Sequence, residues 1–384
     1  MRILIAPDKF KGSLSAQQVA ENIALGIRDV IPDAQIEIAA VADGGEGTAE
    51  VICKARGGEW VTCHAHGPLG NPIEARYVWL SENASAVIEM SEAAGLRALK
   101  DGVRDVLRAN TFGVGEMLLD GAKRGAREIV VGAGGSVTND GGFGMARALG
   151  FRFLTGEREI ENGGPAELIG LARIEAPVTA GVSPAKFSQM QPARLPLQLK
   201  IIAACDVKNP LLGENGATRV FGPQKGATDD KIDILEGALA KFADVVSKEF
   251  GVDYRDELGA GAAGGLGFGL MSFCGAKIRP GFEVVAEAAD LESKMENFDL
   301  VITGEGSLDR QTLQGKTAAG TARLARKLGK PVFAVAGCTD GDRQVRELFD
   351  GVYVLGQPGM SENEKMKRSA ELLREKAQEL AKSL

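Results

Sequence analysis

Both ends of the chain alternate short apolar strands with amphipathic helices, and this rhythm limits the possible folds more than any other feature of the 384 residues. Near the N-terminus, residues 2–6 (RILIA) and 34–42 (AQIEIAAVA) are predicted strands. A helix is predicted between them over residues 15–31, where Ser15 and Gln18 form a capping box at its start. Three more strands, separated by helical segments, are predicted near the C-terminus, over residues 298–304, 331–337 and 351–356.

Either group of strands alone would leave an open core, but five strands together make a complete doubly wound sheet. We therefore predict an α/β protein of two domains, with a flavodoxin-like, five-stranded parallel sheet formed by residues 1–58 and 283–384. Residues 59–282 would form an inserted, mixed α/β domain, because three short strands between residues 59 and 90 follow one another without a helix, as in an antiparallel meander. The alternative of two sequential domains, cut near Phe282, stays open.

The composition excludes several classes of partner. The net charge is -7 and no run of Lys or Arg is present, so nonspecific nucleic-acid binding is not expected. The 5 cysteines are widely spaced and include no Cys-x-x-Cys pair, which is typical of reduced thiols in a cytoplasmic protein. Asp8 ends the first apolar run too early for a signal peptide, and residues 258–276 are uncharged but too rich in Gly and Ala for a membrane span. We expect a cytoplasmic protein without nucleic-acid or membrane partners, either a monomer or a homo-oligomer.

Two charged loops are predicted to face each other at the edge of the five-stranded sheet. In the strand order 2-1-3-4-5, ligands bind beyond the carboxyl ends of the strands where the order reverses, and residues 7–13 and 303–317 would meet there. Carboxylates could hold a metal ion or accept a proton, and lysines could neutralise phosphate, as phosphoryl transfer requires. An exposed connection with solvated charges is the alternative. The catalytic candidates in these loops are Asp8, Lys9, Lys11, Glu305 and Asp309.

The second loop ends in Gly315-Lys316-Thr317, which is similar to the end of a Walker A motif. A P-loop would require glycine at position 310, which is Arg, so this segment is not a P-loop. Lys316 is a candidate phosphate contact, and a helix N-terminus capped by Thr317 with a solvated lysine explains the pattern equally well.

A glycine turn after the second strand, VADGGEGTAE (41–50), combines glycines with acids. Glycines let backbone N–H groups approach an anion, and carboxylates could ligate Mg²⁺. A plain strand-to-helix turn needs fewer glycines. The turn therefore supplies Gly44, Gly45 and Gly47 as phosphate-binding candidates, and Asp43 and Glu46 as magnesium ligands.

The inserted segment carries further glycine-rich turns. Residues 130–144 (VVGAGGSVTNDGGFG) suit a backbone nest around phosphate oxygens, although a structural turn is the alternative. Residues 259–270 are more typical of a close-packed backbone crossing than of a phosphate cradle. The phosphate or substrate candidates are Gly134, Gly135, Ser136, Thr138, Asn139 and Lys225, and the catalytic candidates are Asp140, also a possible metal ligand, and Asp206.

The chain has few histidines that could act in catalysis or bind a metal ion. The sequence has 2 histidines, His64 and His66, and no Gly-x-Ser-x-Gly elbow, which argues against a Ser-His-Asp hydrolase. Both would lie on one face of a strand, but no third metal ligand is evident.

Seven separated segments carry one recognisable pattern: APDKFKGSLSA, ADGGEGT, GAGGSVTNDGG, CDVKNPL, FGPQKGA, GAAGGLGFGL and DLVITGEGSLDRQTLQGK. Together they resemble the bacterial type I glycerate kinase family, and the resemblance spans nearly the whole chain. It implies an ATP-dependent kinase that phosphorylates D-glycerate, usually at the 2-hydroxyl, and so feeds carbon from glycolate, glyoxylate or sugar diacids into glycolysis. It also implies a flavodoxin-like domain, an inserted domain and a cleft between them.

The roles of individual residues follow from chemistry rather than from the resemblance. We expect in-line transfer of the γ-phosphoryl group of MgATP in the cleft between the domains, with Lys9 and Lys11 offsetting the developing charge. The acids Glu305, Asp309 and Asp140 would hold Mg²⁺ or accept the hydroxyl proton. A nicotinamide-dependent oxidoreductase is an alternative, but it requires Gly-x-Gly-x-x-Gly after the first strand, where Pro-Asp-Lys stands. A noncatalytic glycerate-binding sensor is a second alternative.

Overall fold

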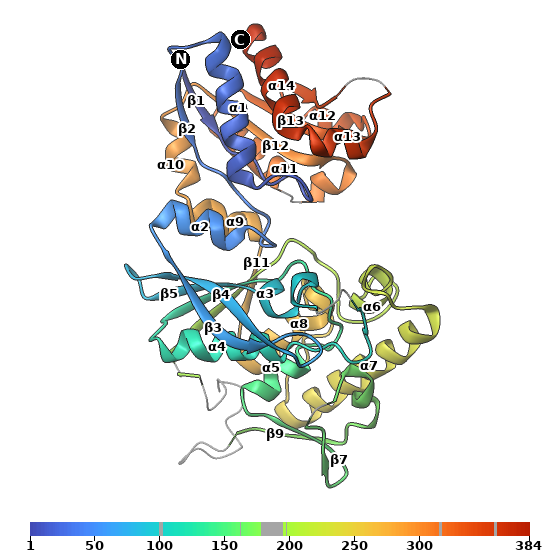
Figure 1. Ribbon diagram of the computed structural model, residues 1–384. Coiled ribbons are helices and arrows are strands. Elements are labelled where there is room, and N and C mark those ends of the chain that lie inside the picture. Colours follow the sequence, from blue (N-terminus) through green and yellow to red (C-terminus); the bar gives the residue numbers. More distant parts are fainter. Residues whose placement is uncertain (100–102, 162, 178–194, 197, 315–316, 357–358) are drawn as a thin grey trace. The chain divides into compact units, whose positions relative to one another are not determined.

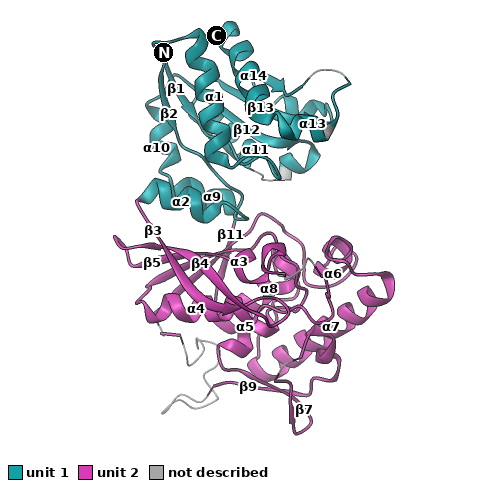
Figure 2. Cartoon of the chain, viewed as in Figure 1, with its two compact units in different colours: residues 1–56, 280–384 teal, residues 57–279 magenta. Residues whose placement is uncertain are grey.

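The structure is a computed structural model that describes residues 1–99, 103–161, 163–177, 195–196, 198–314, 317–356 and 359–384 (Figure 1). The chain divides into two compact units, shown in different colours in Figure 2. Unit 1 comprises Met1–Arg56 and Pro280–Leu384, and unit 2 comprises Gly57–Arg279. Unit 1 is therefore built from both ends of the chain, and unit 2 from the segment between them.

Unit 1 contains a sheet of five parallel strands in the order β14-β13-β12-β1-β2. The N-terminal strand pairs with a strand from the far end of the sequence, since Ile3 lies opposite Leu300. The chain goes to one side of β1 to form β2 and to the other side to form β12, so the strand order reverses between β1 and β12. The strands are β1 (Arg2–Ile5), β2 (Gln35–Ile38), β12 (Leu300–Leu308), β13 (Val332–Thr339) and β14 (Gly351–Val354).

The helix after β1 packs on the sheet together with the C-terminal helix. Val19, Ile23 and Ile27 recur at helical spacing in α1, and all three are buried in a cluster with residues of α14 and the sheet. Gly26 permits this contact, because a Cβ atom there would lie 2.4 Å from the carbonyl oxygen of Arg374. The helices of unit 1 are α1 (Ala16–Val30), α2 (Thr48–Arg56), α9 (Gly281–Ala288), α10 (Leu291–Glu296), α11 (Thr317–Lys327), α12 (Arg343–Arg346), α13 (Glu362–Lys367) and α14 (Ser369–Ser383).

The predicted capping box at the start of α1 is confirmed. The Ser15 hydroxyl accepts the N–H of Gln18 at 3.3 Å, and the Gln18 side chain accepts the N–H of Ser15 at 2.9 Å. Both donors would otherwise lack a partner at the helix start. The loop after β1 therefore ends at a fixed position.

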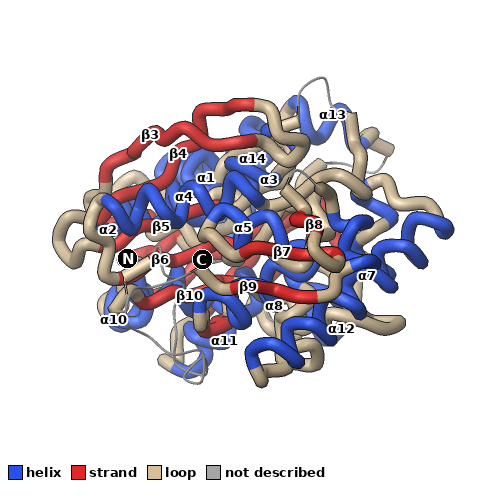
Figure 3. Tube along the Cα trace, turned by 90° about the horizontal axis from the view of Figure 1, so that it is seen from below, coloured by secondary structure: helices blue, strands red, loops and turns tan. Residues whose placement is uncertain are grey.

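Unit 2 contains a six-stranded mixed sheet in the order β11-β10-β6-β5-β4-β3. The predicted meander is confirmed, because β3 pairs antiparallel with β4 and β4 with β5, whereas the remaining neighbours are parallel. A three-stranded sheet, β8-β7-β9, lies beside α7 (Figure 3). The strands are β3 (Glu59–His66), β4 (Pro72–Leu80), β5 (Ser85–Glu89), β6 (Glu128–Gly132), β7 (Arg152–Thr155), β8 (Arg158–Glu159), β9 (Arg173–Glu175), β10 (Lys200–Ala204) and β11 (Lys277–Arg279).

The helices of unit 2 differ widely in length. The longest in the described part is α7, with 22 residues, and its buried apolar residues again recur at helical spacing. The helices are α3 (Ser91–Ala94), α4 (Phe112–Lys123), α5 (Phe143–Ala148), α6 (Ala217–Phe221), α7 (Asp229–Phe250) and α8 (Ala262–Cys274).

The glycine-rich segment 259–270 forms a close-packed crossing, as predicted. It enters α8 through a kink in which Gly264 and Gly265 have φ values of +73° and +88°, a region that favours glycine. A Cβ atom on Gly264 would lie 2.1 Å from the carbonyl oxygen of Thr138. The kink therefore packs directly against the loop after β6. Within the described ranges, no helix is both long and apolar enough to cross a membrane.

Element boundaries differ from prediction in three places. β2 ends at Ile38, before the predicted end at residue 42. β12 continues through a Gly-Glu-Gly segment to Leu308, because Glu305 and Ser307 stay paired with β13. The charged, amphipathic segment 363–384, whose pattern predicts one continuous helix, is divided at Arg368 into α13 and α14. The extension of β12 moves its acidic residue from a predicted loop into the sheet.

Candidate active site

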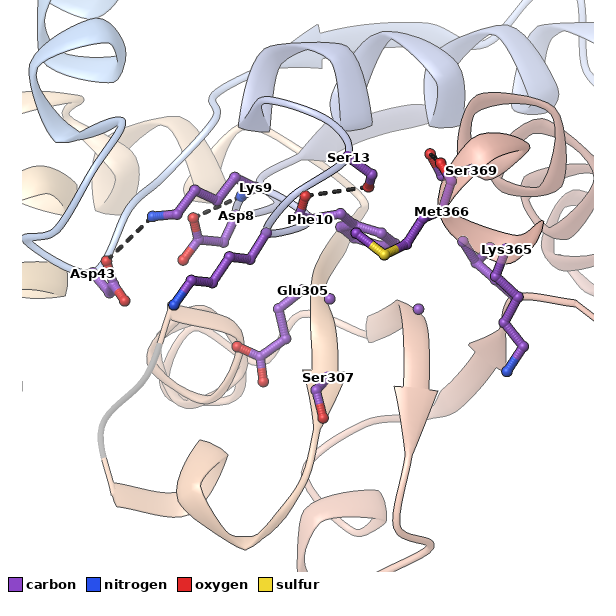
Figure 4. A pocket seen from close by; sticks show the side chains of 14 residues that line it. Asp8, Lys9, Phe10, Ser13, Asp43, Glu305, Ser307, Lys365, Met366 and Ser369 are labelled. Atoms are coloured by element: carbon purple, nitrogen blue, oxygen red, sulfur yellow. Dashed lines mark hydrogen bonds and ion pairs between the residues drawn. The ribbon is translucent and has the colours of Figure 1, made fainter. Parts of the chain in front are cut away.

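A pocket of about 360 Å³ opens in unit 1 at the carboxyl ends of β1 and β12 (Figure 4). Ligands of open parallel sheets bind at this edge. Asp8, Lys9 and Asp43 lie at one end of the view, and Lys365 and Met366 lie at the other. The predicted site residues that the pocket brings together are Asp8, Lys9, Lys11, Asp43 and Glu305, and its apolar lining includes Phe10, Leu355 and Met366.

Asp8 is a buried residue held by three hydrogen bonds, one from its backbone and two to its carboxylate. Its N–H donates to the carbonyl oxygen of Gly304 at 2.8 Å. Its Oδ1 accepts the N–H of Lys9 at 2.6 Å, and its Oδ2 accepts the hydroxyl of Thr317 at 2.6 Å. Burial raises the pKa of Asp8 to about 6, and the negative charge of Asp43 adds to this effect, while Lys9 and Thr317 oppose it. This carboxyl can therefore gain or lose a proton near neutral pH.

Lys9 connects the loop after β1 to the glycine turn after β2. Its Nζ donates to the carbonyl oxygen of Glu46 and lies 3.7 Å from Asp43 Oδ1. The same Oδ1 accepts the N–H of Gly45 at 3.0 Å, so the turn uses this N–H internally. The contacts fix a lysine and a carboxylate side by side at the rim of the pocket.

The glycines of this turn serve its shape in addition to any ligand contact. Gly44 and Gly47 have φ values of +81° and +95°, which L side chains rarely adopt. The turn leads directly into α2 at Thr48. Glu46 lies in the turn, and the described lining of the pocket does not include it.

Glu305 and Asp309 lie at and after the end of β12. Glu305 is 6% exposed, and its Oε1 accepts the hydroxyl of Thr312 at 2.5 Å. Asp309 accepts the N–H of Gln311 at 2.8 Å and the hydroxyl of Ser307 at 3.0 Å. Asp309 orders its own loop and does not belong to the described lining of the pocket. Of these two acids, only Glu305 faces the cavity.

The four predicted magnesium ligands are divided between the two units. Asp43, Glu46 and Asp309 belong to unit 1, whereas Asp140 belongs to unit 2. Among the described residues, no group of three or more His, Cys, Asp or Glu side chains could hold a metal ion. A magnesium site made by protein groups alone therefore does not fit the described part of the chain.

Asp140 is fully buried in unit 2 and orders the loop in which it lies. Its Oδ2 accepts the N–H and the hydroxyl of Thr111, both at 2.8 Å, and the N–H of Gly144 at 2.9 Å. Its Oδ1 accepts the N–H of Gly142 at 3.2 Å. Burial raises the pKa of Asp140. With 0% exposure and four donors, this carboxylate has the contacts of a positioning group rather than of a metal ligand or base.

Thr138, Asn139 and Lys225 are also buried, around Asp140. Lys225 Nζ donates to the carbonyl oxygen of Thr138 at 2.7 Å, and Asn139 Nδ2 donates to Thr218 Oγ1 at 2.9 Å. Burial lowers the pKa of Lys225 to about 7, and the charge of Asp140 partly opposes this shift. These three predicted phosphate contacts lie in the interior of unit 2.

The rest of the predicted set follows the neighbouring strands β6 and β10 in unit 2, or lies outside the described residues. Gly134, Gly135 and Ser136 form the accessible part of the loop after β6, and Gly135 has a φ of +72°. Asp206 is half-buried just after β10. Lys316 lies outside the described residues.

His66 is held by an acidic side chain. Its Nδ1 lies 2.9 Å from Glu116 Oε1, and its N–H donates to Glu116 Oε2 at 2.7 Å. His64 lies on the same strand, β3.

Sequence reasoning missed the threonines that hold the carboxylates. The local sequence predicts Thr317 as a helix cap, and its hydroxyl instead donates to Asp8. Thr312 and Thr111 hold Glu305 and Asp140 in the same way. Nothing in their local sequence distinguishes them from other threonines, since each partner is distant or depends on the loop conformation.

Comparisons with known proteins match nearly the whole chain to one family. The sequence profile of the Glycerate kinase family matches residues 3–384. A glycerate kinase of Halalkalibacterium halodurans is 42% identical over 381 residues, which cover 99% of this chain and 97% of that protein. The glycerate 2-kinase of Escherichia coli is 42% identical over 364 residues, covering 94% of this chain and 89% of that protein.

A solved structure gives the same result for the fold. The crystal structure of a candidate glycerate kinase 2 from Salmonella typhimurium LT2 superposes with a TM-score of 0.80 at 39% sequence identity. The match covers 100% of this chain and 98% of that one. The chain therefore belongs to the glycerate kinase family and is an enzyme of that family.

Proposed function

We propose that this enzyme transfers the γ-phosphoryl group of ATP to the 2-hydroxyl of D-glycerate, giving 2-phosphoglycerate and ADP. Family membership supports the reaction class and implies ATP as the donor. The similarity to a glycerate 2-kinase supports the choice of hydroxyl. Membership of a kinase family also favours transfer over the two alternatives, an oxidoreductase and a noncatalytic sensor.

The unit 1 pocket is the single observation that carries the choice of site. It gathers Lys9 and Lys11 with three carboxylates at the edge of a parallel sheet, where its loops and strand ends converge. Phosphoryl transfer depends on positioning and on stabilising charge that develops on the phosphoryl oxygens, rather than on covalent chemistry by the protein. Two lysines beside acids supply both the compensating charge and a group able to take a proton.

The lysines have different surroundings and so different roles. Lys9 is held by Glu46 and Asp43 and fixes the rim of the pocket. Lys11 is exposed and lines the cavity. We assign the main compensation of phosphate charge to Lys11, with Lys9 contributing from a fixed position.

Magnesium would neutralise the ATP phosphates when bound. Since Mg²⁺ in such sites usually keeps several waters and takes one or two carboxylates together with phosphate oxygens, we propose that it enters with ATP. Binding of Mg²⁺ together with ATP does not require three protein ligands, and the described residues include no group of three or more His, Cys, Asp or Glu that could hold the ion.

The unit boundaries support a further part of the proposal. The strand order in unit 1 is that of a flavodoxin-like sheet, and its two sequence segments flank unit 2. We therefore propose that unit 1 is a flavodoxin-like domain that carries the transfer chemistry, and that unit 2 is an inserted domain.

The test is a coupled ADP-release assay with ATP, Mg²⁺ and D-glycerate, followed by phosphorus NMR of the product. We expect ADP release that depends on D-glycerate, and a single product, 2-phosphoglycerate. L-Glycerate serves as the matched control substrate. Formation of 3-phosphoglycerate would contradict the choice of hydroxyl, and the absence of ADP release would contradict the function.

A further inference from the structure

The carboxylate of Asp8 is held in a fixed position in the pocket and can still accept a further hydrogen bond. We infer that Asp8 accepts the proton of the reacting hydroxyl, and that Thr317 is the positioning residue that holds its carboxylate. This inference rests on the proposed function, because it assigns a proton acceptor to the phosphoryl transfer proposed above.

The backbone at Asp8 is fixed on the sheet. Its N–H donates to the carbonyl oxygen of Gly304 at 2.8 Å. Two residues earlier, the carbonyl oxygen of Ala6 accepts the hydroxyl of Thr303 at 2.8 Å. Both contacts join the end of β1 to β12, at the reversal of strand order. The carboxylate therefore starts from a rigid element, which catalytic positioning requires.

Each oxygen of Asp8 accepts one hydrogen bond from a donor without formal charge, the N–H of Lys9 and the hydroxyl of Thr317. A carboxylate offers about four lone-pair sites, so it keeps capacity for a substrate hydroxyl. Asp8 also lines the pocket although it is only 7% exposed. It is thus available to a ligand in the cavity and largely shielded from bulk water.

The charges around Asp8 suit a proton acceptor. Lys9, Lys11, Asp43 and Glu305 line the same pocket, and the nearby negative charge of Asp43 disfavours a second negative charge. Together with burial, this raises the pKa of Asp8 to about 6. The group is ionised at neutral pH and still basic enough to take a proton in the transition state.

Of the other two pocket carboxylates, one forms an ion pair and one is held like Asp8. Asp43 is paired with Lys9, and its side chain is 39% exposed. Glu305 is buried and held by Thr312 in the same way as Asp8 is held by Thr317. Glu305 is therefore the rival that the experiment must separate from Asp8.

The proposed step balances. The 2-hydroxyl oxygen forms a bond to the γ-phosphorus, the bond from the γ-phosphorus to the bridging oxygen breaks, and ADP leaves with that electron pair. The hydroxyl proton moves to a carboxylate oxygen of Asp8, and later to water. Asp8 returns to its ionised state after each turnover.

Thr317 supplies the contact that orients Asp8. It lies 309 residues away in the sequence, at the start of α11, and is fully buried. A valine at this position keeps the volume and removes the donor. The carboxylate would then be free to rotate, and small displacements of a catalytic group reduce turnover strongly.

The experiment measures kcat and KM of the full-length enzyme and its variants with ATP, Mg²⁺ and D-glycerate. We expect Asp8→Asn to lower kcat by about 10²- to 10⁴-fold, with little change in either KM, because only the proton transfer is lost. We expect Thr317→Val to lower kcat about tenfold, also with little change in KM, and Thr317→Ser to recover most of that loss.

The same helix offers a matched control. Thr321 is a fully buried threonine one turn further along α11, and its hydroxyl contacts no partner within the described residues. Thr321→Val therefore removes a buried hydroxyl without touching Asp8, and we expect an unchanged kcat. A thermal melt of each variant reports whether it is folded.

Several outcomes would overturn the inference. One is a folded Asp8→Asn variant that retains most of its kcat, and another is a Glu305→Gln variant that loses kcat when Asp8→Asn does not. If Asp8→Asn does not fold, the variants Thr317→Val and Thr321→Val test the inference instead. An unchanged kcat in Thr317→Val would show that Thr317 does not position Asp8 for catalysis. A wild-type enzyme that makes no phosphoglycerate would instead overturn the proposed function, and this inference with it.

Discussion

Three buried carboxylates of this enzyme are each held by a threonine hydroxyl: Asp8 by Thr317, Glu305 by Thr312 and Asp140 by Thr111. A buried carboxylate needs donors, because removing it from water without partners is costly. A hydroxyl supplies a donor without adding a positive charge, so it orients the acid and lowers its proton affinity less than a lysine or arginine would. At Asp8, threonine therefore orients the carboxyl group while burial keeps its pKa raised.

At the residue scale, we predict that Lys11→Ala lowers kcat roughly 100-fold with little effect on stability. Removing one well-placed group that stabilises developing charge costs about 3 kcal/mol in the barrier. Lys11 is exposed, so its loss leaves the core intact. Steady-state kinetics and a thermal melt of the same sample check both parts.

Lys9→Ala provides the comparison. Because Lys9 joins two loops through Glu46 and Asp43, its loss should lower both kcat and the melting temperature. Equal melting temperatures for the two variants would show that the contacts of Lys9 contribute little to stability. An unchanged kcat in Lys11→Ala would contradict the assignment of Lys11 as the main compensation of phosphate charge.

A second residue-scale prediction concerns Lys225 and pH. Its pKa is lowered from 10.5 to about 7 by burial, so between these values the unfolded chain binds one more proton than the folded chain. The contribution of this group to the free energy of unfolding therefore rises with pH from about 7 to about 10, and falls on the way down. Between about pH 7 and pH 9 the change is on the order of 2 kcal/mol.

Urea unfolding at these two pH values, for wild type and Lys225→Met, checks the prediction. Methionine cannot titrate, so the variant should lack this part of the pH dependence. Identical changes in the free energy of unfolding for both proteins would contradict it.

The positions of the acids and lysines along the chain could be predicted from the sequence, but their burial and their hydrogen-bond partners could not. The apolar run of β1 indicates that Asp8 and Lys9 follow a strand end, which is a local property. The burial of Asp140 and its four donors depends on Thr111 and Gly144, which the fold brings together. A pattern of glycines and polar residues therefore locates a loop without distinguishing an accessible nest from a buried one.

At the element scale, the contact between α1 and α14 depends on one missing side chain. We predict that Gly26→Ala destabilises the protein by roughly 1–2 kcal/mol. Alanine improves helix propensity by up to about 1 kcal/mol, but the new Cβ atom would lie 2.4 Å from the backbone oxygen of Arg374 and 2.6 Å from Ala377 Cβ. A backbone atom cannot rotate away, and overpacking costs about 1–3 kcal/mol.

The free energy of unfolding in urea measures this balance. Leu25→Ala is the matched control, because its side chain is 45% exposed in the same turn of α1. Its effect should stay within about 0.5 kcal/mol. A Gly26→Ala variant that is more stable than wild type would show that the two helices separate at little cost.

Element types could be predicted better than element ends. The five strands of unit 1 coincide with apolar runs, and the capping box fixed the start of α1. The end of β12 could not be predicted, because Gly304 and Gly306 are typical of a turn and only the pairing with β13 keeps them extended. The break at Arg368 likewise interrupts a continuous helical pattern.

At the scale of the whole molecule, the two units should respond differently to a nucleotide. We predict that ADP with Mg²⁺ slows amide hydrogen exchange in residues 8–13 and 303–308 of unit 1. Saturation at about 100 times the dissociation constant stabilises the bound form by about 2.7 kcal/mol. The loop around Asp140 is already buried, so its exchange should change little.

Hydrogen exchange followed by mass spectrometry gives this comparison within one experiment. Lys11→Ala provides a control sample in which protection of the same segments should be weaker. Protection confined to unit 2 would contradict the assignment of the nucleotide to the unit 1 pocket.

The sheet of unit 1 also has a consequence during synthesis of the chain. β1 pairs with β12, whose first residue, Leu300, is made long after β2 ends at Ile38. At ordinary rates of translation this interval is on the order of ten to fifty seconds. For that time β1 and β2 have an open edge on the ribosome, and every described strand of unit 2 is made before the interval ends. Unit 2 can therefore fold during translation, whereas the sheet that carries Asp8 closes only near its end.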